Sequence, residues 1–264
     1  MPKVDEFLLL NLACGFYLAA MIPAYLDRRR FPYALLIAAC GLGLASHSLS
    51  LALRWVRVGH GPFINLYEIL SSNLWSLMLG LTVFLLLARR HREAMGYVIP
   101  LPAMLMAWLL LTPSKDTYLP ATYDTVWLYF HVLTGKFFLA LLMLATGLAV
   151  YEYRHRAGAL ESAATAAFES VSYRLLAFAF CFQSLMLLFG AVWAQDAWGR
   201  YWAWDPLETW AFVTWVSVIF VLHWRLNHAG QGIYALLVGT SLALAILTFF
   251  GVPFISTAPH QGMI

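Results

Sequence analysis

The sequence predicts an all-α fold, a polytopic helical bundle in a membrane, and three observations lead to this prediction. Of the 264 residues, 62% are hydrophobic and 11% are charged, a composition unlike that of a soluble domain. Eight apolar stretches approach the ~20 residues that a spanning helix needs. These stretches are rich in Leu and Ala and lack the alternation of a membrane β-barrel. Because no repeat or low-complexity linker interrupts the chain, residues 1–264 are expected to form a single membrane domain.

Each predicted span is a continuous apolar run. The run at 97–111 is the shortest and contains Pro100 and Pro102. No small-residue cleavage site follows the N-terminal run, so we expect a retained helix rather than a signal peptide. The eight predicted spans are 7–26, 33–53, 67–88, 97–111, 126–151, 175–194, 208–226 and 233–252.

The distribution of Lys and Arg predicts the orientation of the bundle. If the spans alternate, one side receives Arg28, Arg29, Arg30, Arg89, Arg90, Arg92, Arg154, Arg156, Arg174 and Arg225. The other side receives Lys3, Arg54, Arg57, Lys115 and Arg200. By the positive-inside rule the first side is the cytoplasm, so both termini are expected outside. The net charge of +3 gives no indication of a nucleic-acid partner.

A tryptophan-rich segment, residues 193–215, reads WAQDAWGRYWAWDPLETWAFVTW and holds six of the eleven tryptophans. The predicted orientation places it outside, on the loop between the sixth and seventh spans. Interfacial tryptophans are also typical of the aromatic belt. The density of this cluster, beside Arg200 and Asp205, favours a platform for a large flat ligand. The tryptophans that we expect to contact it are Trp193, Trp198, Trp202, Trp204 and Trp210.

Two histidines are predicted on the same outer face as the tryptophans. His131 begins the fifth span and His260 follows the eighth. Imidazole is a strong ligand for haem iron, and a porphyrin needs apolar walls and cations for its propionates. A histidine near a helix end is more often solvated or hydrogen-bonded, so spacing alone leaves both interpretations open. His47, beside Ser46 and Ser48, is expected to be a hydrogen-bonded helix residue.

Other polar residues also have more than one interpretation. His223, near the inner end of the seventh span, is an intramembrane ligand or an interfacial residue whose ring reaches the surface. Lys136 is predicted to extend outward, where its ammonium would meet a propionate. Asp205 is either the N-cap of the seventh span or a participant in ligand binding. Asn65 and Glu68 predict a capping box at the start of the third span.

Several separated motifs resemble one known family. WGRYWAWDPLETWAFVTW is similar to the WWD signature of haem-handling proteins. GPFINLYEIL, WLYFHV, VLHWRL and FGVPFISTAPHQG follow the order and approximate separations of the CcsA (ResC) family, the polytopic subunit of the system II cytochrome c synthase. The likeness extends from about residue 60 to the end. The chain departs from it at Leu207, where the family usually has Lys, and at Gln261-Gly262, where it has Ser-Tyr.

The resemblance implies a function in cytochrome c biogenesis. It implies that haem b is the ligand, that His131 and His260 bind its iron at the outer face, and that His223 belongs to an intramembrane haem site. The partners implied are a CcsB (ResB) protein that supplies the other ligand of that inner site, apocytochrome c and thiol-reducing proteins. Haem would be attached covalently to a Cys-x-x-Cys-His motif, a haem lyase activity expected of this chain with its partner. The location implied is a bacterial inner membrane, or a thylakoid membrane if the chain is organellar.

Other classes of protein remain as alternatives. A HemX-like assembly or regulatory protein would bind haem without synthase activity, although members of that group usually lack the WWD segment. A respiratory cytochrome b would need pairs of histidines on facing helices. A transporter of another hydrophobic substrate would show no haem absorbance on purification.

Overall fold

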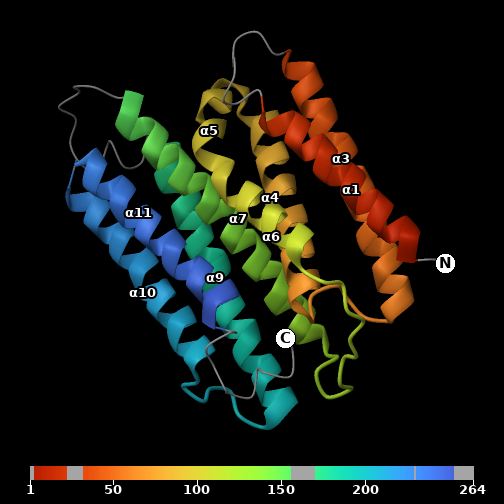
Figure 1. The fold of residues 1–264 in the computed structure, drawn as a ribbon. Coiled ribbons are helices and arrows are strands. Elements are labelled where there is room, and N and C mark those ends of the chain that lie inside the picture. The colour runs from red at the N-terminus through yellow and green to blue at the C-terminus, as the bar shows by residue number, and fades with distance from the viewer. Residues whose placement is uncertain (1–2, 23–31, 156–169, 229, 253–264) are drawn as a thin grey trace. The chain divides into compact units, whose positions relative to one another are not determined.

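The computed structural model describes residues 3–22, 32–155, 170–228 and 230–252, and all regular elements within these ranges are helices (Figure 1). The predicted all-α membrane fold is therefore confirmed. A helix covers most of each of the eight predicted spans. Among the described residues, six helices are long and apolar enough to cross a membrane, or up to seven if one bent pair forms a single span. The count is thus lower than the predicted eight, and α1 (Lys3–Met21) is not among the six.

Residue contacts divide the chain into two compact units, Met1–Leu119 and Pro120–Ile264, and each is described by itself. The prediction of a single domain stays a prediction. In the first unit, α1 packs along α3 (Tyr33–Val58), and α4 (Leu66–Leu87) packs on α3 and on α6 (Pro100–Leu111).

The predicted span at 97–111 is a bent pair of helices. The short helix η1 (Arg89–Ala94) and α5 (Met95–Val98) precede α6, and the axis bends by 51° between the two parts. Pro100 stands at the first turn of α6. Proline has no backbone N–H to donate and its ring collides with the preceding turn, so a continuous straight helix is disfavoured at this point.

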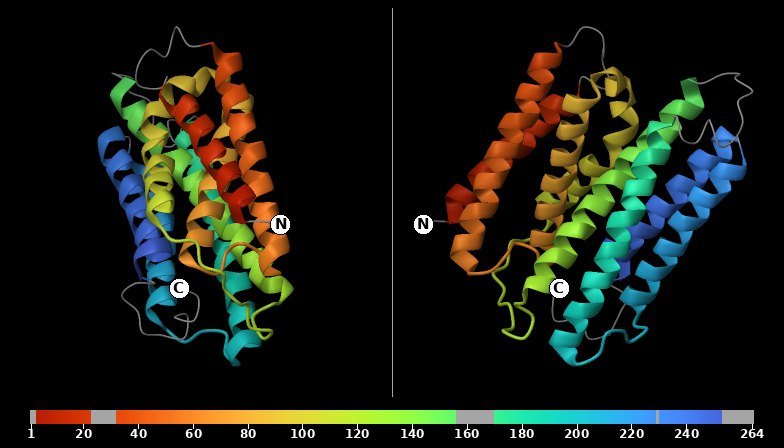
Figure 2. Two further views of the ribbon diagram at one scale, coloured as in Figure 1. Left: turned by 45° about the vertical axis from the view of Figure 1, so that its right-hand side comes forward. Right: turned by 180° about the vertical axis from the view of Figure 1, so that it is seen from behind.

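The described part of the second unit contains four long helices, α7 (Val126–His155), α9 (Val171–Trp198), α10 (Pro206–Asn227) and α11 (Gln231–Ile246) (Figures 1 and 2). The π-helical turn η2 (Leu247–Gly251) follows α11 directly. α7 and α9 run antiparallel, since Trp193 near the end of α9 bonds to Tyr123 just before α7, and Ser172 near the start of α9 bonds to Ala145 in the second half of α7. α10 and α11 also run antiparallel, since Arg225 near the end of α10 bonds to Gln231 at the start of α11. The core between them is apolar, with Leu139, Leu148 and Val238 fully buried.

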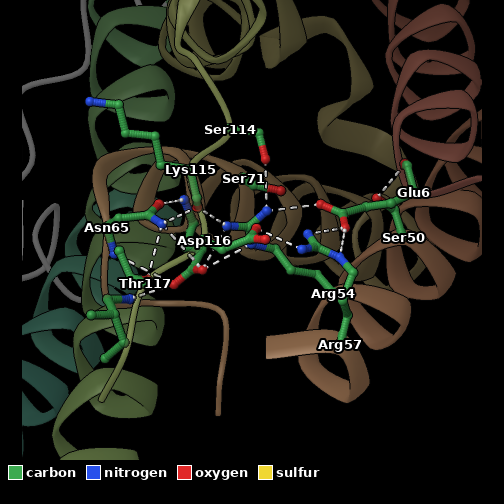
Figure 3. Close-up of polar contacts among 12 residues, drawn as sticks. Glu6, Ser50, Arg54, Arg57, Asn65, Ser71, Ser114, Lys115, Asp116 and Thr117 are labelled. Carbon is green, nitrogen blue, oxygen red and sulfur yellow. Dashed lines mark hydrogen bonds and ion pairs between the residues drawn. The ribbon is translucent and has the colours of Figure 1, made fainter. Parts of the chain in front are cut away.

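Buried charges link three helices of the first unit (Figure 3). The Arg54 guanidinium lies 3.0 Å from a Glu6 carboxylate oxygen and 2.9 Å from one of Glu68, and all three side chains are at most 2% exposed. Arg57 donates to Glu6 and to Asp116. The sequence predicted Arg54 and Arg57 as outer-face charges beyond a helix ending at 53. Instead α3 continues to Val58 and carries both arginines into this ion-pair network.

The same network fixes a segment that precedes the second unit in sequence. Arg54 donates to the hydroxyl of Ser114 and to the carbonyl of Lys115. Asn65 donates to the Lys115 carbonyl and to the hydroxyl of Thr117. The predicted capping box of Asn65 and Glu68 is confirmed at the start of α4.

His47 is hydrogen-bonded, as predicted, and it is buried, with bonds to residues of two other helices. Its Nε2 lies 3.0 Å from the Ser71 hydroxyl and its Nδ1 lies 3.3 Å from the Tyr17 hydroxyl. The neighbouring hydroxyl of Ser48 accepts from the indole of Trp75 instead.

Candidate functional site

His131 lies near the start of α7, and its side chain contacts α9. Its Nδ1 lies 2.8 Å from the backbone carbonyl oxygen of Met186. A carbonyl can only accept, so Nδ1 carries the proton and donates it, and Nε2 is the ring nitrogen with the lone pair. Histidine ligands of metals almost always donate their other ring N–H in this way, which fixes the tautomer and the ring orientation.

Trp193 forms a wall beside this imidazole. The two rings are stacked, with centroids 6.2 Å apart and planes inclined by 16°. The Trp193 side chain is 3% exposed, and its indole nitrogen donates to the carbonyl of Tyr123 at 3.1 Å. Trp198 meets the Trp193 ring edge-on at 5.0 Å. Trp193 therefore supports His131 from inside the helix pair and is not an exposed platform residue.

A second aromatic group occupies the connection between α9 and α10. The rings of Trp202 and Trp204 meet edge-on at 5.7 Å, and Trp204 meets Phe212 at 6.0 Å. Phe212 then stacks on Trp215 with the planes inclined by 14°. Trp204 is 66% exposed and Trp202 is partly buried. This group, and not Trp193, supplies the exposed aromatic surface.

Residues 193–215 are mostly helical, and the connection between the two helices is shorter than the predicted 195–207. α9 continues to Trp198, beyond the predicted end at 194, and stops at Gly199, whose φ of 78° lies in the left-handed region. Trp204 also has a positive φ, 57°, which is unusual for a residue with a side chain. Only 199–205 lie between the two helices. We refer to the end of the second unit that carries 193–215 as the tryptophan end.

Asp205 caps α10, as one interpretation of the sequence predicted. Its side chain accepts a hydrogen bond from the Glu208 backbone N–H at 2.9 Å, and Pro206 occupies the first turn. The Glu208 carboxylate accepts from the Ala203 backbone N–H at 2.7 Å. Both carboxylates thus stabilise the connection, and Asp205 is only 8% exposed.

Three other predicted site residues, Arg200, Trp210 and Lys136, lie on different elements of the second unit. Arg200 is exposed in the connection, and Trp210 is 36% exposed on α10. Lys136 is half-buried on α7, five residues after His131. At about 100° per residue this separation is about 140° around the helix, so the two side chains leave α7 on different faces. The predicted contact of Lys136 with a propionate stays a prediction.

His223 lies far from His131, toward the opposite end of the second unit. It is exposed on α10, and its Nδ1 lies 2.9 Å from the Ile219 carbonyl one turn earlier. Trp215, which bonds to α9 at Ser184, lies about 12 Å before it along the helix axis. The structure thus separates His223 from the tryptophan end, as predicted. His260 lies outside the described residues.

Arg225, two residues after His223, is buried near the end of α10. Its guanidinium donates to the His228 carbonyl and to the Gln231 side-chain oxygen, each at 3.0 Å. The Gln231 amide nitrogen donates to the buried Glu152 carboxylate at 3.2 Å. The amide therefore bridges a buried cation and a buried anion, which explains how Arg225 is tolerated at 2% exposure.

Sequence reasoning missed three components of the His131 environment. The Met186 carbonyl, Gly190 beneath the ring and the Tyr123 carbonyl were not predicted. A backbone acceptor leaves no mark in a sequence. An isolated glycine within an apolar helix, however, is a recognisable signal of close approach.

The comparisons with known proteins agree with this architecture. A family model described as cytochrome C assembly protein matches residues 38–260. The chain belongs to the cytochrome c assembly protein family. Cytochrome c biogenesis protein CcsA of Prochlorococcus marinus strain MIT 9301 is 28% identical over 250 residues, which cover 81% of this chain and 80% of that protein.

A further relative comes from a eukaryote. Cytochrome c biogenesis protein CcsA of Chlamydomonas reinhardtii is 29% identical over 227 residues, covering 81% of this chain and 64% of that protein. Membership of the family and the apolar helices make the chain an integral membrane protein of cytochrome c biogenesis.

Proposed function

We propose that this family member holds haem at the tryptophan end of the second unit and presents it for covalent attachment to apocytochrome c. The main observation behind the proposal is the fixed orientation of the His131 imidazole. Its Nδ1–H is bound to the Met186 carbonyl and its ring lies against Trp193, so Nε2 is the nitrogen suited to iron.

The residues at this end fit haem in two further ways. Trp204 and Tyr201 are 66% and 60% exposed, which supplies apolar surface for a porphyrin face. The indole nitrogen of Trp202 is buried and has no hydrogen-bond partner within the described part of the chain. An unsatisfied buried donor calls for an acceptor, and a propionate carboxylate is one. Arg200 is exposed in the same connection and offers a cation.

We assign the second iron ligand of this site to His260. Thr248 in η2 bonds to Thr214 in the first half of α10 at 3.1 Å. The last described residue, Val252, follows Thr248 by about one turn and so lies toward the tryptophan end. In the proposed orientation this end lies outside the membrane, where a secreted apocytochrome c can reach the site.

The exposed position of His223 supports a second, inner haem site shared with a partner. Its ring is directed away from the core of its own unit, so another protein can reach it. We propose a CcsB (ResB)-like membrane protein as the source of the other ligand, and we assign haem lyase activity to the assembly of both chains.

In the proposed reaction this chain's residues orient and retain the substrate. His131 and His260 hold the iron, and the aromatic group around Trp204 fixes the plane of the ring, which leaves the vinyl groups accessible. Each reduced thiol of the Cys-x-x-Cys-His motif adds its S–H across one vinyl C=C bond, so one C–S and one C–H bond form and no group leaves. The motif histidine then replaces one protein imidazole.

The test is co-expression of the chain with a CcsB-like protein and a reporter apocytochrome c. We expect His131→Ala or His260→Ala to lower haem absorbance of the purified chain and covalent haem on the reporter by about tenfold or more. Loss of a group that only orients a metal ligand already costs about 10–100-fold in metal affinity. Omission of the partner is expected to abolish reporter maturation.

His155→Ala is the matched control, because His155 lies at the other end of the same helix, where its Nδ1 bonds to the Tyr151 carbonyl one turn earlier. Unchanged haem absorbance and maturation in the His131→Ala, His260→Ala double variant would reject the proposed site.

A further inference from the structure

Gly190 of α9 lies directly beneath the His131 ring. A Cβ atom at this position would stand 2.7 Å from Nδ1 and 2.9 Å from Cε1 of the imidazole. Real Cβ atoms do not approach other atoms so closely, so a side chain at 190 would displace the ring. Glycine also weakens a helix relative to alanine, and the close approach of the ring supplies a reason for its presence here.

Gly190 and the Met186 carbonyl belong to one turn of α9. In an α-helix the carbonyl of residue 186 accepts the N–H of residue 190. The same oxygen accepts the Nδ1–H of His131 at 2.8 Å, using its second lone pair. The imidazole can reach this oxygen only by crossing the surface of the helix at position 190.

The ring has little freedom to move away from a side chain at 190. Trp193, one turn further along α9, stacks on the imidazole with the planes inclined by 16°. Trp193 is itself buried, and its indole nitrogen is bound to the Tyr123 carbonyl. A shift of His131 would therefore disturb its stacking on Trp193 or break the bond to Met186.

We propose that Gly190 is a positioning residue for His131, because it lets the imidazole close on the Met186 carbonyl and so fixes the Nδ1–H tautomer with Nε2 as the ligand nitrogen. This inference rests on the proposed haem function for its purpose, but the tautomer itself is a property of the haem-free chain. A hydrogen bond from Nδ1 to a carbonyl also increases the basicity of Nε2, which strengthens its bond to a metal.

The test compares Gly190→Ala with two other glycine-to-alanine variants. Gly135→Ala also crowds the contact between α7 and α9, since its Cβ would lie 3.1 Å from the Met186 sulfur, but the three atoms nearest to that Cβ belong to Met186 and Phe249 and not to His131. Gly239→Ala lies on α11 where no atom stands within 4 Å of the added Cβ. Thermal unfolding midpoints in detergent show whether each variant is folded.

The first measurement is the nitrogen NMR spectrum of the haem-free full chain, with histidines labelled by nitrogen-15 and His131 assigned by its loss in His131→Asn. We expect an Nδ1–H tautomer in the unmodified chain and in both control variants, and a different tautomer or a mixture in Gly190→Ala. An Nε2–H tautomer in the unmodified chain, or an unchanged spectrum in folded Gly190→Ala, would overturn the inference.

The second measurement is haem titration of the same samples. We expect Gly190→Ala to weaken haem binding by about 10–100-fold, the effect typical of losing a group that orients a metal ligand. The Gly239→Ala control should bind as the unmodified chain does. A normal affinity in Gly190→Ala with an altered tautomer would refute the link to ligation. If His131→Ala also binds haem normally, the proposed haem site itself fails, and the tautomer result still decides the positioning of His131.

Discussion

At the scale of single residues, the functions of Trp193 and Gly190 differ from those that composition suggests. Trp193 is buried and supports an imidazole, whereas a bare backbone position, Gly190, decides where that imidazole lies. Asp205 is a helix cap with one carboxylate oxygen bound to a backbone N–H.

The capping function of Asp205 predicts how its variants behave. Asp205→Ala removes the acceptor for the Glu208 N–H, and we expect the free energy of unfolding to fall by about 1 kcal/mol. Asp205→Asn keeps a side-chain oxygen and should keep both stability and reporter maturation. The measurements are denaturation in detergent and covalent haem on the reporter. A stable Asp205→Asn variant that has lost maturation would show that the charge itself is needed.

At the scale of elements, buried ion pairs hold the helices of the first unit together. Arg54 of α3 meets Glu6 of α1 and Glu68 of α4, and no member of this triad is more than 2% exposed. Removing one partner of such a group leaves an uncompensated buried charge. The helix ends therefore depend on all three residues at once.

We expect Arg54→Leu to lower the free energy of unfolding by about 3–5 kcal/mol, the usual effect of breaking a buried pair. Glu6 keeps Arg57 in this variant, so changing Glu68 to Gln in the same chain removes the carboxylate that loses its cation and should restore part of the loss. Thermal unfolding of the purified variants measures both. Arg92→Leu, at a half-buried position in η1, is the control. Equal stability of Arg54→Leu and the control would contradict a structural function for the triad.

At the scale of the whole molecule, the predicted orientation places residues 193–215 outside and the arginine-bearing turns in the cytoplasm. Arg200 and Arg90 are both exposed in the structure and stand on opposite predicted sides. Either position therefore accepts a cysteine for labelling. The native thiols at Cys14, Cys40 and Cys181 must first be replaced, since all three are free.

In that background, we expect a membrane-impermeant thiol reagent to label Arg200→Cys in intact cells. Arg90→Cys should react only after the membrane has been permeabilised, because the positive-inside rule places it in the cytoplasm. Mass spectrometry of the purified chain measures the extent of labelling. The reverse pattern would overturn the orientation and, with it, an external site at His131.

The sequence predicted the helices well and their mutual contacts poorly. Apolar runs of sufficient length determine where helices form, so within the described residues a helix covers most of each predicted span, and prolines bend the one at 97–111. The His131 environment needed a carbonyl on another helix, and His47 found hydroxyls on two others instead of its neighbours in sequence. Such partners depend on how helices face each other, which periodicity does not specify.

The backbone of Trp204 bears on efforts to stabilise this protein. A side chain held at a φ of 57° costs on the order of 1–3 kcal/mol that glycine would not incur. A selection for thermal stability alone would therefore favour glycine or asparagine at 204 and discard the most exposed indole of the connection. Stabilised variants selected in that way would be unsuitable for measuring the proposed haem function, because positions where stability and activity conflict are typical of functional sites.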